Sequence, residues 1–338
     1  IILRPADRRA GNNSGGHGPP DMLGSAVMDQ PSPFLSKREP VCPPDLIARA
    51  AALPTPRVAI ARAGAPLPMQ AAQEASEAGI MVPVFVGETA DIRRQADALH
   101  WNISDFAIHD ATGEAQAAEI ATHLCGAGEA DVLMKGQLHT DAFMKAALQR
   151  DAGLRTDQQL FHIFHISHPD GGRPILVSDA AVNVAPNPET RQSALRGCVD
   201  LLHRLGNERP KVAILSATES VIPSVPSAVE GDELAKWAAG EIKDADVAGP
   251  LALDLILSPD AVETKGLGGH PVAGRADAVI VPDIVSGNVL FKALVYLSGG
   301  CAGGIVMGAK VPILLTSRAD PPAARLASAA LAAIVSAP

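Results

Sequence analysis

Short apolar segments alternate with longer amphipathic ones along most of the chain after residue 43. The apolar, β-branched runs predict strands, and segments with apolar residues every three or four positions predict helices. The predicted strands are 57–62, 81–86, 130–134, 161–167, 174–177, 211–215, 278–281, 304–307 and 313–315. The predicted helices are 45–53, 66–77, 115–124, 188–205, 228–243, a segment near 251–257, 288–297 and 323–335. This alternation is typical of βαβ units with a parallel sheet.

One pair of neighbouring strands departs from that alternation. Segments 161–167 and 174–177 flank the turn-forming sequence Pro169-Asp170-Gly171-Gly172, which predicts a hairpin. No internal repeat is present. At 338 residues the chain is long enough for two cores, so we predict an α/β fold of two α/β/α domains facing each other across a cleft, with the hairpin in the second domain. Residues 1–40, rich in Gly, Pro, Asn and Ser, are predicted to be a flexible tail or linker.

Composition excludes several classes of partner. The formal net charge of −9 at pH 7 argues against binding to a nucleic acid backbone, and 3% aromatic residues leave few platforms for stacked bases. No apolar run is long enough to span a bilayer. An anionic small ligand remains compatible with an acidic protein that has a local basic cleft.

Metal, disulfide and nucleotide motifs are missing. The four cysteines lie far apart without a CxxC pair, which favours free thiols in the cytoplasm. His162, His165 and His168 are three residues apart, so on a strand they point to alternating faces and predict no metal site. GxGxxG does not occur, and Gly308 is followed by Ala309-Lys310 rather than by Lys-Ser/Thr. Neither a dinucleotide nor ATP is therefore expected as a cofactor.

The segment VPILLTSRAD (311–320) carries the strongest candidate chemistry. It delivers Ser317, Arg318 and Asp320 to the carboxyl end of a buried strand, where α/β sheets bind ligands. An Arg guanidinium suits phosphate or a developing oxyanion, and Asp can move a proton. The alternative is that Ser317 caps the following helix, with Asp320 at capping-box spacing and Arg318 in solvent.

Three other strand ends carry small or anion-binding residues. They are Lys135, Gly136 and Thr140 after 130–134, Ser178, Asp179 and Asn183 after 174–177, and Asp283, Gly287 and Asn288 after 278–281. Asp179 could instead form a turn, and Asp283 could simply cap a helix. Together these strand ends predict a site for a phosphorylated or anionic substrate.

Six segments, in order along the chain, closely resemble the phosphate acetyl/butyryltransferase family. They are ADVLMKG (130–136), SDAAVNVAPN (178–187), KVAILSATESV (211–221), GPLALDLILS (249–258), HPVAGRADAVIVPDIVSGNVLFKALVYLSG (270–299) and GAKVPILLTSRAD (308–320). The resemblance spans about residues 55–335 and is nearer to the butyryltransferase branch.

The resemblance implies a fold like that of isocitrate and isopropylmalate dehydrogenases. The first domain would be residues 41–155 plus 305–338, and the second would be 156–304. It also implies reversible transfer of an acyl group from acyl-CoA to inorganic phosphate, without metal or bound cofactor. A homodimer and functional pairing with an acyl kinase are further expectations.

Residue roles follow from the same resemblance. Ser317 would hydrogen-bond to the thiol sulfur, and Arg318 would hold phosphate and polarise the carbonyl. Relatives carry a carboxylate base where this chain has Ala323 and Ala324, which leaves Asp320 as the nearby candidate. Lys145 stands where relatives have an Arg. The alternatives are a dehydrogenase of the same fold and a catalytically impaired homologue that only binds these ligands.

Overall fold

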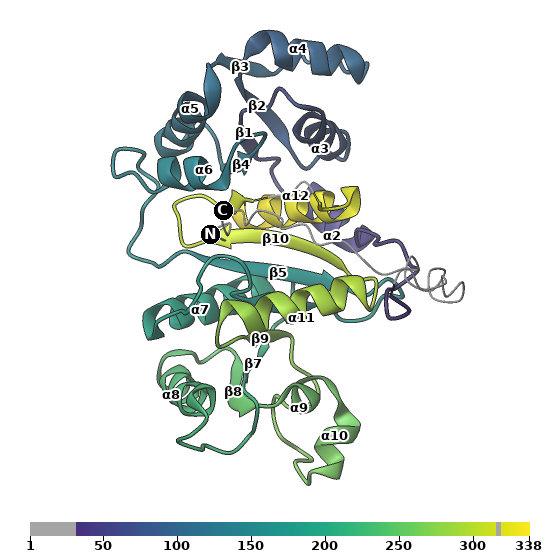
Figure 1. The fold of residues 1–338 in the computed structure, drawn as a ribbon, viewed down its shortest axis with the longest axis vertical. Coiled ribbons are helices and arrows are strands. Elements are labelled where there is room, and N and C mark those ends of the chain that lie inside the picture. The colour runs from purple at the N-terminus through teal and green to yellow at the C-terminus, as the bar shows by residue number, and fades with distance from the viewer. Residues whose placement is uncertain (1–31, 316–318) are drawn as a thin grey trace, which may run out of the picture.

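An eleven-stranded mixed sheet forms the centre of the molecule, with helices on both faces (Figure 1). The computed structural model describes residues 32–315 and 319–338. The strands are β1 Arg57–Ala61, β2 Val82–Gly87, β3 Ala107–Asp110, β4 Val132–Lys135, β5 Phe161–Ser167, β6 Ile175–Ser178, β7 Lys211–Leu215, β8 Asp246–Leu251, β9 Ala278–Ile280, β10 Cys301–Met307 and β11 Ile313–Leu314.

The described helices cover the sheet from both sides. They are α2 Pro44–Ala51, α3 Pro66–Glu77, α4 Thr89–Ala98, α5 Gly113–Ala127, α6 Thr140–Ala147, α7 Pro188–Arg204, α8 Pro226–Glu241, α9 Leu253–Leu257, α10 Pro259–Thr264, α11 Ile284–Tyr296 and α12 Pro322–Ser336. Alternate residues of β1 enter different cores, because successive side chains of a strand point to opposite faces. Val58 and Ile60 pack in a cluster shared with α2, α3 and α12, whereas Ala59 and Ala61 pack in one shared with α5 and α6.

The strands lie in the order β3-β2-β1-β4-β11-β10-β5-β6-β9-β7-β8. The flanking groups, β3 to β11 and β6 to β8, are each parallel. Three antiparallel pairings separate them: β11 with β10, β10 with β5, and β5 with β6. The two parallel groups therefore run in opposite directions along the sheet.

The predicted α/β class and the hairpin of β5 and β6 are confirmed. The parallel pairing predicted from the βαβ alternation holds in the two flanking groups but not for β10, which pairs antiparallel with both β11 and β5. Two strands, β3 and β8, were not predicted, and they form the two edges. β3 is partly exposed along its whole length, and β8 contains Gly249 and Pro250, so neither shows the pattern of a buried strand.

The predicted helix starts agree with the structure for some helices and differ for others. Proline occupies the first position of α3 and α7, whose predicted starts agree with the structure. α11 begins at Ile284, four residues before its predicted start at 288, because Asp283 caps it. Helices α4, α6 and α10 were not predicted.

Segments from the two ends of the described chain join the sheet region. β11 pairs with β4, and α12 packs against α2 and α3. In the segment before α2, the N–H of Ser36 donates to the carbonyl of Tyr296 at 2.8 Å, and Arg38 forms an ion pair with Asp170. The division into domains stays a prediction. Within the described residues, no helix is long and apolar enough to cross a membrane.

Candidate active site

Apart from Lys145 on α6 and Asp320 before α12, the predicted site residues that the structure describes lie at or after the carboxyl ends of strands in two parts of the sheet. We call residues 135–140 with Arg62, Glu88 and Glu114 the β4 end. We call residues 178–183 with Asp283, Gly287 and Asn288 the β6 end. Thr140 is exposed in the first turn of α6, and Lys145 is exposed in its last turn.

Gly136 brings the loop after β4 against the end of β1. Its N–H donates to the carbonyl of Ala61 at 2.9 Å, and the N–H of Gln137 donates to the carbonyl of Arg62 at 2.9 Å. A β carbon at position 136 would overlap both carbonyl oxygens and lie 3.0 Å from the carbonyl carbon of Arg62. Only glycine fits there, so the close approach of two backbones explains this residue.

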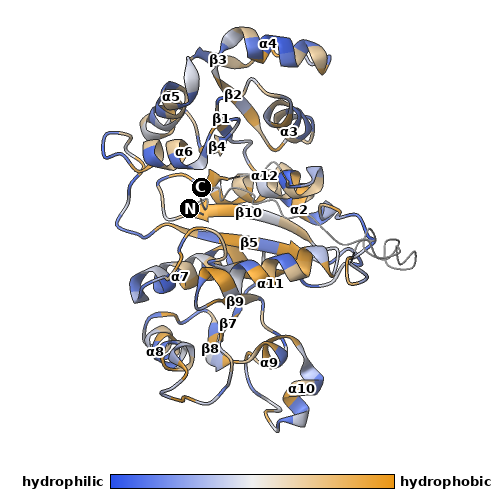
Figure 2. Cartoon of the chain, viewed as in Figure 1, coloured by the Kyte–Doolittle hydropathy of each residue, from blue (hydrophilic) through white to orange (hydrophobic). Residues whose placement is uncertain are grey.

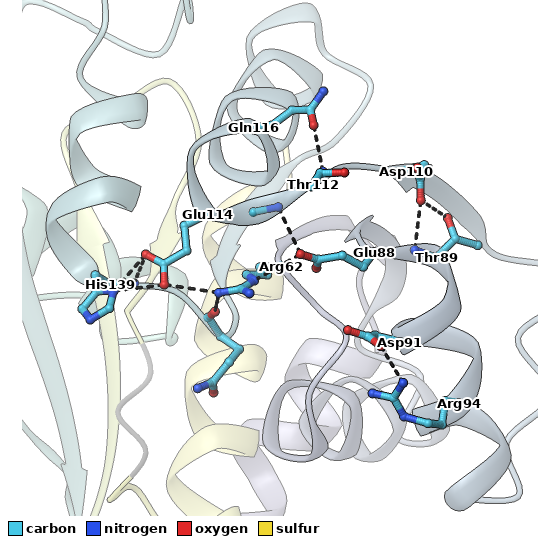
Figure 3. A network of polar contacts seen from close by, with 12 residues as sticks. Arg62, Glu88, Thr89, Asp91, Arg94, Asp110, Thr112, Glu114, Gln116 and His139 are labelled. Carbon is cyan, nitrogen blue, oxygen red and sulfur yellow. Dashed lines mark hydrogen bonds and ion pairs between the residues drawn. The ribbon is translucent and has the colours of Figure 1, made fainter.

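Arg62 follows β1 and contacts the same loop with its side chain. Its Nη1 lies 3.3 Å from Glu114 Oε1 and donates to the carbonyl of Gln137 at 3.3 Å (Figure 3). Its Nε lies 3.7 Å from Glu88 Oε1. The φ angle of Arg62 is 54°, which is uncommon for a residue other than glycine.

Glu114 connects the first turn of α5 to the N-cap of α6. Its carboxylate accepts hydrogen bonds from the backbone N–H of His139 at 3.0 Å and from the His139 ring Nδ1 at 2.9 Å (Figure 3). These two hydrogen bonds, together with the charge of Arg62, lower the pKa of Glu114 below its ordinary value. Glu88 accepts from the N–H of Gly113 at 3.0 Å. The network therefore joins the ends of β1, β2 and β4 to the start of α5.

The residues of this network were not predicted from the sequence. Arg62, Glu88, Glu114 and His139 come from four separate segments, and no local motif connects them. The available signal was an acidic residue in the first turn of a helix, which is a common stabilising feature and points to no partner.

Ser317 and Arg318 lie in 316–318, outside the described residues. Within the described residues, Ile313 and Leu314 pair in parallel with Leu133 and Met134. The carboxyl end of β11 therefore lies beside that of β4, where Lys135 is the last residue.

The start of the final helix, α12, tests the alternative that Ser317 caps it. α12 begins at Pro322 with Pro321 as its N-cap, so a capping box at 317 and 320 is wrong. Ala323 and Ala324 lie in the first turn, where Ala324 is buried. Asp320 precedes the cap, and its carbonyl accepts from Arg325 Nη1 at 2.6 Å. Its catalytic role stays a prediction.

At the β6 end, Asp179 organises its own loop. It is 2% exposed. Oδ1 accepts from the N–H groups of Ala181 and Val182 at 2.9 Å, and Oδ2 accepts from the N–H of Asn183 at 3.2 Å and from Asn183 Nδ2 at 2.5 Å. The turn-forming interpretation of Asp179 is confirmed. Asn183 Nδ2 also donates to the carbonyl of Leu160 at 2.8 Å, and Ser178 is fully buried.

The start of α11 packs against that loop. Asp283 Oδ1 accepts from the N–H groups of Val285 and Ser286 at 2.9 Å, which confirms the capping interpretation. A β carbon at Gly287 would lie 2.9 Å from the Cα of Ala180, so glycine allows the helix to approach. Asn288 Nδ2 donates to the carbonyl of Ala180 at 3.5 Å. The structure thus brings both predicted strand-end segments of this half together.

No cluster of three or more metal-ligating side chains occurs within residues 32–315 and 319–338. His162 and His165 are buried in β5, and the four cysteines are buried free thiols. Their burial raises the pKa of Cys42 to about 12 and of Cys301 to about 11, so these thiols stay protonated at neutral pH.

The model of the phosphate acetyl/butaryl transferase family matches residues 114–333, which include every predicted site residue. The chain belongs to this family. It is 39% identical over 265 residues to the phosphate acetyltransferase of Rhizobium meliloti, covering 78% of this chain and 84% of that protein. It is 35% identical over 280 residues to the phosphate butyryltransferase of Clostridium acetobutylicum, covering 82% and 93%.

A solved structure agrees with this assignment. The branched-chain phosphotransacylase from Enterococcus faecalis V583 superposes with a TM-score of 0.73 at 29% identity, covering 83% of this chain and 99% of that one. The resemblance seen in the sequence is confirmed. Relatives named for acetyl and for butyryl transfer match at similar identity, so identity does not separate the two branches.

Proposed function

We propose that this chain catalyses reversible transfer of a short acyl group between coenzyme A and inorganic phosphate. The observation that carries the proposal is the family match over 114–333, which spans both clusters of candidate residues. A phosphate oxygen attacks the thioester carbonyl, a C–O bond forms, the C–S bond breaks, and CoA leaves as a thiolate that takes up a proton. Phosphate is already a nucleophile, so positioning and oxyanion stabilisation would provide most of the rate.

In this proposal the chain after β11 and the β4 end act together. Arg318 holds phosphate and polarises the carbonyl, Ser317 hydrogen-bonds to the sulfur, and Asp320 moves the thiol proton. Lys135, Gly136, Thr140 and Lys145 bind the anionic groups of the substrates. The parallel pairing of β11 with β4 supports this arrangement, because it brings Leu314, three residues before Ser317 in the sequence, beside the carboxyl end of β4.

The β6 end is proposed to form the other wall of the same site, between two α/β/α domains like those of isocitrate dehydrogenase. One contact supports this: Val182 from the β6 end packs on the same buried cluster as Met144 of α6 and Leu315. Ser178, Asn183 and Asn288 would then border the substrate. In that site neither a metal nor a bound cofactor takes part.

A cytoplasmic homodimer completes the proposal, with an acyl kinase as a functional partner that uses the acyl phosphate. α11 is strongly apolar and exposes Val285, Val289 and Tyr296, which are 68%, 62% and 53% exposed (Figure 2). Exposed apolar faces of this kind often mark protein interfaces. A second copy of the chain is the partner we propose for it.

The test is release of free thiol from acetyl-CoA or butyryl-CoA, measured with and without phosphate. We expect phosphate-dependent release that persists after exhaustive chelation. Arg318→Ala is expected to lower turnover by about 10²–10³-fold, the usual loss for one transition-state donor, and Arg318→Lys to recover part of it.

Other results of this assay would favour one of the alternative functions. Loss of activity on chelation, restored by Mg²⁺ or Mn²⁺, would favour a dehydrogenase of this fold. Binding of both ligands without any thiol release would indicate a catalytically impaired homologue. Near-normal turnover of Arg318→Ala would remove the central role of that residue.

A further inference from the structure

The polar network at the β4 end surrounds a loop that carries proposed substrate-binding residues. We propose that Glu114 and Arg62 are positioning residues, which fix the loop 136–139 and so place Lys135 and Thr140 against the phosphate groups of the substrates. This inference rests on the acyl-transfer function proposed above. Neither residue is assigned a direct contact with substrate.

The network contacts nearly every position of the loop 136–139. The N–H of Gly136 is bound to Ala61, and Gln137 is bound to Arg62 through both its N–H and its carbonyl. The N–H of His139 is bound to Glu114 at 3.0 Å. Since Leu138 between them is buried, the loop has little freedom to move unless these contacts break.

The backbone at Arg62 adopts an uncommon conformation. A residue with a side chain at φ 54° lies in a sparsely populated region, and such a conformation persists where its surroundings hold it. Here the carbonyl of Arg62 accepts from Gln137, and its guanidinium lies between Glu88 and Glu114. Such conformations gather at functional sites, which fits a role in shaping this one.

His139 fixes the start of α6 through Glu114. It is the N-cap residue of α6, yet its side chain makes no capping hydrogen bond. Its ring turns to Glu114 instead, at 2.9 Å, where it forms the second of two bonds from the same residue to one carboxylate. The start of α6, and with it Thr140, is therefore fixed by Glu114 rather than by a local cap.

The experiment compares three variants by kcat and by KM for phosphate. Glu114→Ala removes the acceptor of the His139 N–H, and we expect kcat/KM for phosphate to fall about tenfold to a hundredfold, mostly through KM. Glu114→Gln keeps one carbonyl acceptor and should recover part of the loss. His139→Ala removes the ring bond to Glu114 but keeps the backbone N–H bond, so it should lose less than Glu114→Ala, which loses both.

Arg94→Ala is the matched control. Arg94 forms an ion pair with Asp91 at 2.6 Å on α4, in the same half of the sheet but outside the loop (Figure 3). Exposed pairs of this type contribute little, so its kinetics should match wild type within about twofold. Thermal unfolding of every variant separates a kinetic effect from loss of the folded state.

Unchanged KM for phosphate in Glu114→Ala would overturn the inference. A larger loss in His139→Ala than in Glu114→Ala would overturn it too, because the ring would then act on the substrate directly. If Glu114→Ala does not fold, Glu114→Gln decides: a raised KM supports positioning, and wild-type kinetics contradict it. A wild-type chain without phosphate-dependent thiol release would instead overturn the proposed function, and this inference with it.

Discussion

The β6 end and the β4 end both follow parallel strands, but their polar groups are used differently. At the β6 end, Asp179 is buried and its two oxygens accept four hydrogen bonds from its own loop. An ionised carboxylate has about four acceptor sites, so this one has none left for a substrate. At the β4 end, Arg62 and Glu114 are about one-third and one-quarter exposed and connect different loops. Asp179 therefore stabilises the conformation of one loop, whereas Arg62 and Glu114 hold several segments of the chain together.

The largest expected effect concerns the stability of the protein at acidic pH and depends on β5, the strand that pairs with β10 and β6 in the centre of the sheet. Burial lowers the pKa of His162 and of His165 in β5 to about 4. The unfolded chain, with a histidine pKa near 6.5, binds more protons between pH 6.5 and 4, so stability must fall as pH falls through that window. The expected loss by pH 4 is about 3 kcal/mol for each histidine, from about 1.4 kcal/mol per pKa unit.

Urea unfolding at several pH values between 7 and 4 measures this slope. His165→Gln is expected to remove about half of it, whatever its effect on stability at pH 7. The interval from pH 6.5 to 5 is decisive, because ordinary carboxylates remain ionised there. A wild-type stability that does not change across that interval would contradict the prediction.

The next largest effect tests whether the hydrogen bonds of Asp179 hold the loop at the β6 end. Asp179→Ala leaves the N–H groups of Ala181, Val182 and Asn183 without their acceptor, and each partly buried group left so costs about 1–3 kcal/mol. We expect a loss of about 3 kcal/mol in the free energy of unfolding. Asp179→Asn retains the Oδ1 acceptor and should lose less. Equal losses in the two variants would show that the charge, rather than the hydrogen bonds, holds the loop.

A smaller effect tests the close approach at the β4 end. Gly136→Ala places a β carbon against the carbonyls of Ala61 and Arg62, and we expect about 1–3 kcal/mol of destabilisation with displacement of the loop. Gly240→Ala in α8 is the matched control, since its β carbon meets nothing within 4 Å. In a helix that change should stabilise by up to about 1 kcal/mol. The opposite signs are measurable by thermal unfolding.

The smallest effect concerns the cap of α11. Asp283→Ala removes the acceptor of two backbone N–H groups and should cost about 1 kcal/mol. Asp283→Asn can still cap and should cost only a few tenths of that. A larger loss of acyl-transfer activity than of stability in Asp283→Ala would indicate that this end contacts substrate after all.

The features that the sequence predicted are buried strands and side chains whose hydrogen-bond partners lie close to them in the chain. The strands found from sequence are largely apolar, such as Val82–Gly87, whereas the two missed ones lie at the edges of the sheet. Edge strands bury little and are often short, polar or interrupted by proline, as β3 and β8 are. The roles of Asp179 and Asp283 as turn former and cap were open to prediction for the same reason, since their partners are within four residues.

The sequence by itself determined the α/β class, the hairpin, the four strand ends with candidate chemistry and the family resemblance, because each depends on local pattern or on ordered motifs. Tertiary structure decided which strands pair. Ile313 lies beside Leu133 in a parallel pair, whereas Cys301 lies beside Ser167 in an antiparallel one. The three antiparallel pairings in the centre reverse the direction of half the sheet. It also decided that Arg62, Glu88 and Glu114 meet the loop before α6. Charged side chains from separate loops carry no sequence period, so only the folded backbone brings them together.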